Sequence, residues 1–503
     1  MSYRQLEQHF RDLSHLQHVA SMMYWDESVM MPAGSGAARA DAMATFQVVL
    51  HRYLTDPRLS DWIAAAKERQ ADLSSFQRAN VREIERQVLR AQGMPADLVA
   101  RSARACMTCG QAWRSMRVEN DWAGFSPLLT EVLAIKREQA AALGDVLDLA
   151  PYDALMDEYE PGARTARIDL VFADLREFLP DLTEQIVERQ RGLPAPLLPP
   201  GPFPVADQRR LGLRLIELVG FDFEHGRVDI SHHPFCGGVP TDVRITTRYD
   251  ETDFTSALMG LLHETGHAKY EQGLPRQWLG QPVGAARGMS MHEGQSLLQE
   301  MQISRGRDFL EFAAPIIAAA FPEAAREQPQ AFSPENLHRL YTRVERGLIR
   351  VDADEVTYPC HVLLRYDLEQ SLLNGSMEVC DIPEAWDAGM RELIGIGTGL
   401  DYRDGCMQDV HWSEGAFGYF PTYTLGALTA AQVFAAAKRD VPNLGTELCA
   451  GRFESLNAYL RARIWQQGSL YDVDELMRQA TGETLNPAYF RRHLEARYLR
   501  DEG

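Results

Sequence analysis

DFTSALMGLLHETGHAKYE, the stretch from Asp253 to Glu271, combines the apolar spacing of an α-helix with a His-Glu-x-x-His motif. Leu258, Leu261 and Leu262 fall on one side of such a helix, and Asp253 is a suitable N-cap residue. The sequence therefore predicts a helix here that carries the motif on one of its faces.

The motif itself consists of His263, Glu264 and His267. On a helix, positions four residues apart differ by about 40° in direction and about 6 Å in height, so both imidazoles can bind one cation. Glu264 projects about 100° away from His263 and is placed to act as a base. The alternative is a purely structural helix, but random placement yields this motif only about 0.02 times in such a chain. We therefore interpret the segment as part of a metal site.

A catalytic zinc ion has three protein ligands and one open position, so another segment must supply the third ligand. Tyr270 and Gly273 stand where the extended motif HExxHxxGxxH would place glycine and histidine, so that motif is absent. Glu293, near the start of a second predicted helix, is our choice, with His292 and Glu300 as alternatives. Spacing alone does not separate a ligand from a glutamate that stabilises the N-terminus of its helix.

Most of the remaining sequence also has helical periodicity, so the predicted fold class is mainly α. Amphipathic segments occur at residues 4–23, 75–118, 166–191, 335–350, 425–438 and 452–466. Ser126 and Pro127 predict the start of a further helix, as N-cap and first-turn residues.

One pair of β-strands is expected, at residues 227–231 and 242–247, because polar and apolar residues alternate in the second segment after a glycine- and proline-containing turn. Asp242, Arg244 and Thr246 would share one face of this small sheet. Such alternation usually marks a solvated face on a half-buried sheet.

The proline-rich segment 193–205 is the one clear break in composition, with six prolines. It cannot be helical throughout its length. We predict a single catalytic domain, residues 1–503, in which this segment is a surface loop. The alternative is a linker between an N-terminal helical part, residues 1–192, and a catalytic part, residues 206–503.

Composition and charge limit the function classes. The 503 residues are 45% hydrophobic and 24% charged, as in ordinary folded proteins. The net charge of −20 disfavours binding to nucleic acid or to a membrane surface. A charged N-terminal start and the lack of a long apolar run predict a cytoplasmic protein. Seven scattered cysteines predict reduced thiols, and the lone Cys106-x-x-Cys109 pair is read as two ordinary thiols.

Five blocks of sequence resemble those of the carboxypeptidase Taq family of zinc-type metallocarboxypeptidases, in the order of that family. They are DVRIT at 242–246, HETGH at 263–267, HEGQ at 292–295, IRVDAD at 349–354 and GCMQDVHW at 405–412. The N-terminal pairs Trp25-Asp26, Met31-Pro32 and Arg39-Ala40 are similar as well, so the resemblance spans nearly the whole chain.

This resemblance implies a large helical zinc-peptidase fold with a long central groove and the small sheet beside the active site. It implies a homodimer that releases single amino acids from peptide C-termini with broad specificity, C-terminal proline being a poor substrate. It assigns His263, His267 and Glu293 to one divalent metal ion, with zinc favoured over cobalt or manganese, and Glu264 to the role of general base.

Two further residues are candidates for stabilising the oxyanion that forms during hydrolysis. His411 and Tyr423 are our choice, by comparison with related helical zinc peptidases, and Tyr419 is the alternative to Tyr423. A histidine or tyrosine in such a stretch is more often a hydrogen-bonded core residue.

A carboxypeptidase also needs a group that binds the free carboxylate of its substrate, for which the forked guanidinium of arginine is well suited. Arg350 is the leading candidate and Arg244 the second. The structural alternatives are a helical ion pair of Arg350 with Asp354 and a pair of Arg244 with Asp242. Two other functions stay open: an endo-acting oligopeptidase and a non-enzymatic helical interaction scaffold.

Overall fold

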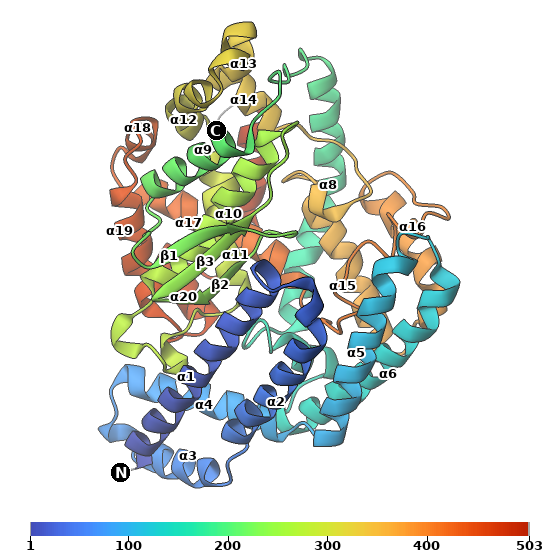
Figure 1. The fold of residues 1–503 in the computed structure, drawn as a ribbon, viewed down its shortest axis with the longest axis vertical. Helices are drawn as coiled ribbons and strands as arrows, with labels where there is room; N and C mark the ends of the chain where they lie inside the picture. Colours follow the sequence, from blue (N-terminus) through green and yellow to red (C-terminus); the bar gives the residue numbers. More distant parts are fainter. Residues whose placement is uncertain (1, 501–503) are drawn as a thin grey trace.

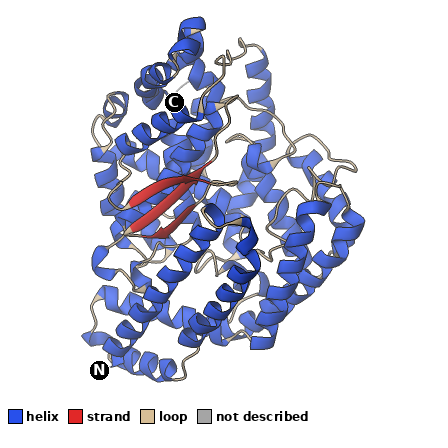
Figure 2. Cartoon of the chain, in the orientation of Figure 1, coloured by secondary structure: helices blue, strands red, loops and turns tan. Residues whose placement is uncertain are grey.

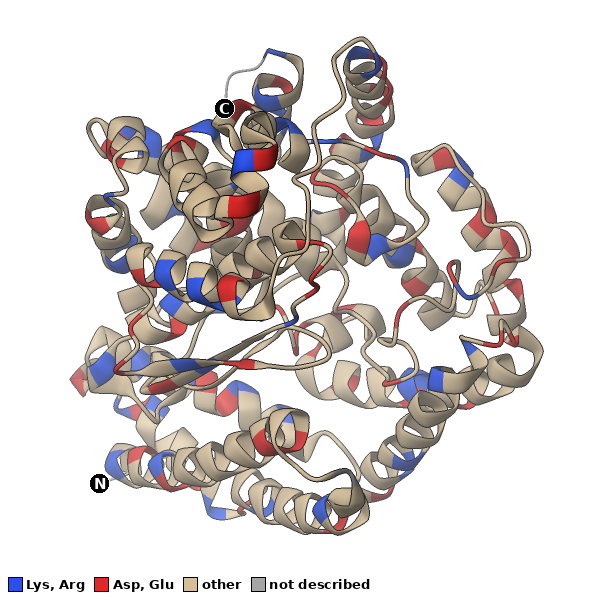
Figure 3. Ribbon diagram, turned by 45° about the horizontal axis from the view of Figure 1, so that its top comes forward, with Lys and Arg blue, Asp and Glu red and all other residues tan. Residues whose placement is uncertain are grey.

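The computed structural model describes residues 2–500 and consists almost entirely of α-helices, with one small β-sheet (Figures 1 and 2). The predicted mainly α fold is confirmed. Figure 3 shows acidic and basic residues interspersed along these helices. Within residues 2–500, no helix is long and apolar enough to cross a membrane. None of the seven cysteines, all of which lie in this range, forms a disulfide, as predicted.

Nine α-helices of the described residues precede the sheet. They are α1 (Ser2–Val29), α2 (Gly36–Leu54), α3 (Arg58–Glu68), α4 (Ser75–Gln92), α5 (Ala96–Met116), α6 (Trp122–Leu147), α7 (Pro151–Met156), α8 (Thr165–Arg191) and α9 (Val205–Leu218). The first four enclose a small core of their own that includes Leu6, Phe10 and Ile84. Figure 1 shows them as the blue layer next to the strands.

The helices that follow the sheet carry most of the predicted site. They are α10 (Phe254–Gly273), α11 (Met289–Leu297), α12 (Arg307–Ala320), α13 (Pro322–Glu327), α14 (Pro334–Tyr341), α15 (Tyr358–Asn374), α16 (Ile382–Leu393), α17 (Pro421–Asp440), α18 (Leu444–Cys449), α19 (Glu454–Arg463), α20 (Val473–Thr481) and α21 (Ala488–Leu494). A π-helix, Leu298–Ser304, continues α11 directly, and a second one, Glu495–Leu499, follows α21. π-helical segments are rare and are frequently found at functional sites.

The sheet has three strands, β1 (Gly226–Ile230), β2 (Cys236–Val239) and β3 (Asp242–Thr247), in the order β1-β3-β2. The predicted pair, β1 and β3, is parallel, and the missed strand β2 pairs with β3 in an antiparallel hairpin. β2 reads CGGV and has no alternating pattern by which to predict it. The fully buried Val243 and Ile245 face the core, where β3 packs on α10.

Three predicted helix boundaries were wrong. The segment 75–118 is two helices, α4 and α5, because Gly93 and Pro95 separate them. The segment 335–350 is helical only as far as Tyr341. Ser126 does not begin a helix: α6 starts earlier, with Asp121 as its N-cap accepting from the Gly124 amide at 2.9 Å.

A large core joins the parts of the chain on either side of the proline-rich segment. Leu129 and Phe172 precede that segment, Val362 and Trp386 follow it, and all four belong to one buried cluster. The segment itself is held by two hydrogen bonds of 2.8 Å between the main chain of Leu197 and the Asn336 side chain. A single domain, residues 1–503, remains our prediction, and this shared core supports it.

Candidate active site

The predicted helix carries the His-Glu-x-x-His motif as expected. Asp253 caps α10 through a 2.8 Å hydrogen bond from the Thr255 amide to its carboxylate. The rings of His263 and His267 lie on the same side of α10, with centroids 5.1 Å apart. The predicted N-cap and the predicted placement of both histidines are confirmed by the geometry.

Glu293 reaches these histidines from α11. One of its carboxylate oxygens lies 3.4 Å from Nε2 of His267, and the other lies 3.8 Å from Nε2 of His263. The side chain of Glu293 is 11% exposed. Donors arranged tetrahedrally around zinc are about 3.3 Å apart, given zinc–ligand distances of about 2.0–2.1 Å. The three side chains therefore converge on a space that fits one metal ion.

Glycines allow α10 and α11 to approach closely enough for this convergence. A Cβ atom on Gly266, inside the motif, would lie 2.4 Å from the carbonyl oxygen of Gln295 on α11. A Cβ atom on Gly426 of α17 would lie 2.7 Å from Cβ of Glu293. Neither contact is sterically feasible. Both positions therefore require glycine if α11, which carries Glu293, is to pack this closely against α10 and α17.

Glu300, an alternative metal ligand in the sequence, instead holds His263 from behind. Its carboxylate lies 2.9 Å from Nδ1 of His263, which donates the hydrogen bond because a carboxylate only accepts. Arg305 donates to the other oxygen of Glu300 at 2.5 Å. This directs Nε2 of His263 toward Glu293, as in metal sites whose histidines are oriented by carboxylates, and a bound metal ion would take the place of the proton on this atom.

His292, the other alternative ligand, orients His267 in the same way. Nε2 of His292 donates to the Glu271 carboxylate at 2.9 Å, so its Nδ1 accepts from Nδ1 of His267 at 2.6 Å. Burial lowers the pKa of His267 to about 4. His267 is thus neutral, with a free lone pair on Nε2.

Carboxylates outnumber cations around the two histidines. Burial would lower the pKa of His263, but the charges of Glu293 and Glu300 and the hydrogen bond to Glu300 raise it to about 10. Glu264 is itself buried, and that burial raises its pKa to about 7. We call His263, Glu264, His267, Glu293 and Glu300 the acidic wall. Its excess of negative charge favours a bound cation, and Glu264 has the pKa of an effective general base.

The acidic wall lines one side of a cavity of about 770 Å³. Arg350, Tyr358, Tyr419 and Tyr423 line it as well. Phe235, next to strand β2, also lines the cavity, which places the sheet beside the site as expected.

Arg350 is buried and held by a neighbouring motif rather than by Asp354. It begins a short 3-10 turn and not an α-helix, so the structural alternative, an i,i+4 pair with Asp354, does not form. Its Nη2 lies 2.8 Å from the carboxylate of Asp409, and its Nη1 donates to the hydroxyl of Tyr358 at 2.5 Å. Its main-chain amide donates to the side chain of Gln408 at 2.7 Å. The blocks at 349–354 and 405–412 therefore hold each other in place.

Arg365, which the sequence analysis missed, shares the carboxylate of Asp409 with Arg350, at 2.6 Å. Within residues 2–500, Asp409 is the only carboxylate paired with either arginine. We call Arg350, Tyr358 and Tyr423, with Arg365 and Asp409 behind them, the basic wall. Two buried cations and one anion leave this wall with an excess positive charge, the opposite of the acidic wall.

His411 lies behind Tyr423 and does not line the cavity. Its Nε2 is 3.1 Å from the Tyr423 hydroxyl, while its Nδ1 is buried without a partner among the described residues. Burial lowers the pKa of His411 to about 4, so the ring is neutral. Tyr419 also lines the cavity, with its ring centroid 5.2 Å from that of Tyr423. The structure thus brings both tyrosines, but not His411, to the cavity.

Arg244 lies apart from the other candidates. It forms a two-pronged ion pair with Asp242, at 2.9 and 2.7 Å, and its guanidinium lies 5.8 Å from the centre of the Trp25 ring. It does not line the cavity. The observed ion pair with Asp242 is the structural alternative that the sequence analysis named for Arg244.

Sequence reasoning also missed Tyr358 and Arg305. Tyr358 lies outside the five blocks, and Arg305 follows the π-helix, whose geometry leaves no recognisable spacing in the sequence. Asp409 lies in the block at 405–412, so the resemblance of that block was the signal in the sequence that could have identified it.

Comparisons with known proteins show the family to which the chain belongs. Residues 5–498 match the model of the family described as carboxypeptidase Taq (M32) metallopeptidase. Thermostable carboxypeptidase 1 of Thermus thermophilus is 38% identical over 507 residues, which cover 99% of this chain and 98% of that protein. The structure of metallocarboxypeptidase 1 of Trypanosoma cruzi is 43% identical and superposes with a TM-score of 0.96 over 99% of both chains.

An M32 carboxypeptidase of Deinococcus radiodurans superposes with a TM-score of 0.93, at 32% identity and 99% coverage of both chains. These structures confirm the predicted helical peptidase fold. The chain belongs to the carboxypeptidase Taq (M32) family and is a metal-dependent carboxypeptidase that acts on peptides.

Proposed function

We propose that His263, His267 and Glu293 hold one divalent cation, zinc in preference to cobalt or manganese. One donor atom from each of the three residues lies within 4.8 Å of the other two, and the two oxygens of Glu293 lie 3.4 and 3.8 Å from the two rings, which supports this assignment. The hydrogen bonds from His263 to Glu300 and from His267 to His292 support it further, because they turn Nε2 of each ring toward Glu293. When bound, such an ion polarises a carbonyl group and lowers the pKa of a water molecule to about 7.

The substrate is a peptide with a free C-terminus, and the enzyme removes its last residue. The observation that carries this proposal is the opposite charge imbalance of the two walls across one cavity. The excess positive charge of Arg350 and Arg365 attracts the terminal carboxylate, which places the last peptide bond beside Glu264.

Glu264 is the general base of the proposed reaction. It accepts a proton from the attacking water molecule and then delivers a proton to the amine as the C–N bond breaks. Tyr423, with Tyr419 as the alternative, donates a hydrogen bond to the oxyanion that develops on the carbonyl oxygen. His411 acts through Tyr423, since its ring contacts the hydroxyl and does not reach the cavity.

Broad side-chain specificity follows from the size and lining of the cavity. About 770 Å³ is ample for several residues of a peptide, and Met289, Leu297 and Met301 line it with flexible apolar side chains. A homodimer and a cytoplasmic location also remain predictions.

The proposal is tested with a blocked peptide whose last residue is varied. We expect release of the C-terminal amino acid that a chelator abolishes and zinc restores. Mass spectra of a longer peptide should show a ladder of single-residue losses from its C-terminus. Internal cleavage would instead identify an endo-acting oligopeptidase, and no chelator-sensitive cleavage would refute the proposal.

A further inference from the structure

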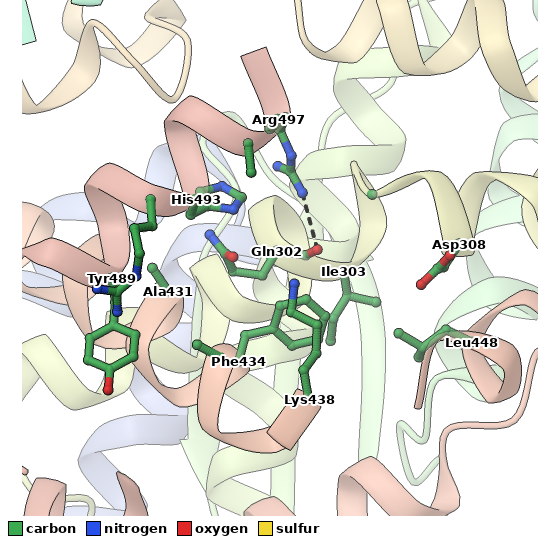
Figure 4. A pocket seen from close by; sticks show the side chains of 14 residues that line it. Gln302, Ile303, Asp308, Ala431, Phe434, Lys438, Leu448, Tyr489, His493 and Arg497 are labelled. Carbon is green, nitrogen blue, oxygen red and sulfur yellow. Dashed lines mark hydrogen bonds between the residues drawn. The ribbon is translucent and has the colours of Figure 1, made fainter. Parts of the chain in front are cut away.

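A second, smaller cavity lies on the other side of the π-helix Leu298–Ser304. Glu300 and Met301 of this helix line the active-site cavity, Ile303 lines the second cavity, and Gln302 lines both. The second cavity has a volume of about 200 Å³ and is shown in Figure 4. Sites for drug-sized ligands measure about 300–1,000 Å³, so only a smaller molecule fits here.

Lys438 of α17 supplies a positive charge to this cavity. Within residues 2–500 its ammonium group pairs with no carboxylate, and it lies 4.8 Å from the centre of the Phe434 ring. Burial and the charge of Arg497 lower the pKa of Lys438, whereas the charge of Asp308, which lines the same cavity, raises it. Arg492 also lines the cavity and likewise has no ion pair in the described chain. Its guanidinium stacks on Tyr489 at 4.4 Å.

Asp308 of α12 supplies a negative charge. In the part of the chain that the structure describes, its carboxylate forms no ion pair and accepts one hydrogen bond, from the thiol of Cys449 at 3.4 Å. Figure 4 shows Asp308 and Leu448 at one end of the cavity, Tyr489 at the other, and Lys438 between them. Lys438 and Asp308 thus line the same small cavity and act on each other through their charges, but they form no ion pair within residues 2–500.

Apolar side chains complete the cavity. Phe434 stands beside Lys438, Leu448 lies next to Asp308, and Ile303 and Ala431 also line the space (Figure 4). A lone carboxylate or a lone ammonium ion would leave one of the two charges without a partner. A molecule that carries a carboxylate, an ammonium group and an apolar group can pair with both charged side chains and also contact the apolar ones.

We propose that this cavity binds a free α-amino acid with an apolar side chain. Its carboxylate pairs with Lys438, its ammonium group pairs with Asp308, and its side chain packs against Phe434 and Leu448. That this ligand is also the enzyme's own product rests on the function proposed above. The charges and shape of the cavity define the ligand independently of that function.

One buried carboxylate of the active-site cavity accepts hydrogen bonds from residues that line the second cavity. Glu355 lines the active-site cavity and accepts from His493 at 2.8 Å and from Arg497 at 3.1 Å, and both of these residues line the second cavity. Arg497 also donates to the main-chain oxygen of Met301 at 2.6 Å. A bound amino acid would therefore lie directly behind the helix that carries Glu300.

Calorimetric titration tests the site with L-leucine, leucinamide and 4-methylpentanoate, the last two lacking one of the two charges. We expect L-leucine to bind the wild-type enzyme, and at least tenfold weaker binding of leucinamide and of 4-methylpentanoate. Lys438→Gln and Asp308→Asn should each weaken L-leucine binding at least tenfold. Lys67→Gln is the matched control, because Lys67 pairs with Glu85 at the surface, and should bind as the wild type does.

A crystal soaked with L-selenomethionine supplies a second, independent measurement. We expect an anomalous selenium peak between Phe434 and Leu448 in the wild type and none there in Lys438→Gln. A peak confined to the His263 cavity, or unchanged L-leucine affinity in both variants, would overturn the proposal. Peptide hydrolysis is assayed in the same samples, so failure of the proposed function is seen separately from failure of this site.

Discussion

The acidic and basic walls belong to the same cavity but are built in different ways. The acidic wall comes from α10, α11 and the π-helix that continues α11, and its two histidines are related by a local spacing of four residues. The basic wall comes from a 3-10 turn, an irregular loop, α15 and the first turn of α17, which only the folded chain brings together. The difference shows that a regular helix determines relative positions locally, whereas irregular segments depend on long-range ion pairs.

The largest effect is expected from removing the base of the acidic wall. Glu264→Gln keeps the shape of the side chain but cannot accept a proton, so kcat should fall by about 10³–10⁴-fold. Metal content, measured by atomic emission, should remain near one ion per chain. His263→Ala should lose both the metal and the activity. Retained activity in either variant contradicts the assigned roles.

The basic wall is tested by Arg350→Gln. Loss of one buried charged hydrogen-bonding partner lowers kcat/KM by about 10²-fold or more for peptides with a free C-terminus. The wild type should strongly prefer such a peptide over its C-terminal amide, and the variant should lose that preference. A variant that keeps the full preference would show that Arg350 does not recognise the carboxylate.

The outer hydrogen bond of the acidic wall is tested by Glu300→Gln. The amide of the variant accepts the hydrogen bond from His263 without the negative charge of the carboxylate. Metal affinity should therefore fall by about 10–100-fold. A competition titration with a chromophoric chelator measures this change. Activity at saturating metal should largely recover, and failure to recover would show that Glu300 has a role besides orienting His263.

The close approach of α10 and α11 is tested by Gly266→Ala. The added methyl group would overlap the main chain of α11, so the free energy of unfolding should fall by about 1–3 kcal/mol. Metal affinity should fall with it, because Glu293 moves away from the histidines. Gly260→Ala on the same helix is the matched control, since a Cβ atom there meets no atom within 4 Å. Equal behaviour of the two variants in urea unfolding would rule out this account.

The smallest effect is expected at Arg244. Its guanidinium pairs with Asp242 away from the cavity, so Arg244→Gln should change kcat/KM by less than about threefold. The value of kcat/KM is measured with the same free-acid and amide peptides as for Arg350→Gln. If Arg244→Gln lost the preference for the free acid over the amide and Arg350→Gln kept it, Arg244 and not Arg350 would be the residue that binds the substrate carboxylate.

Several parts of the site could be predicted because they depend on local geometry. The capped helix, the two histidines and the glutamate between them follow from residues 253–271 alone. Glu293 needed the family resemblance, since its sequence separation from His263 says nothing about how α10 and α11 pack. The structural alternative for Arg350, an i,i+4 pair with Asp354, does not form because this segment is a 3-10 turn, and Asp354 instead accepts from the Thr357 amide at 3.0 Å.

The sequence alone determined that two imidazoles face the same way, because a helix repeats every 3.6 residues whatever surrounds it. Only the tertiary structure decided that Glu293 lies 3.4 and 3.8 Å from the two imidazoles, that Asp409 joins Arg350 to Arg365, and that His411 contacts Tyr423 without lining the cavity. These contacts connect residues on separate segments, and their positions depend on how closely neighbouring helices pack and which buried charges must be neutralised.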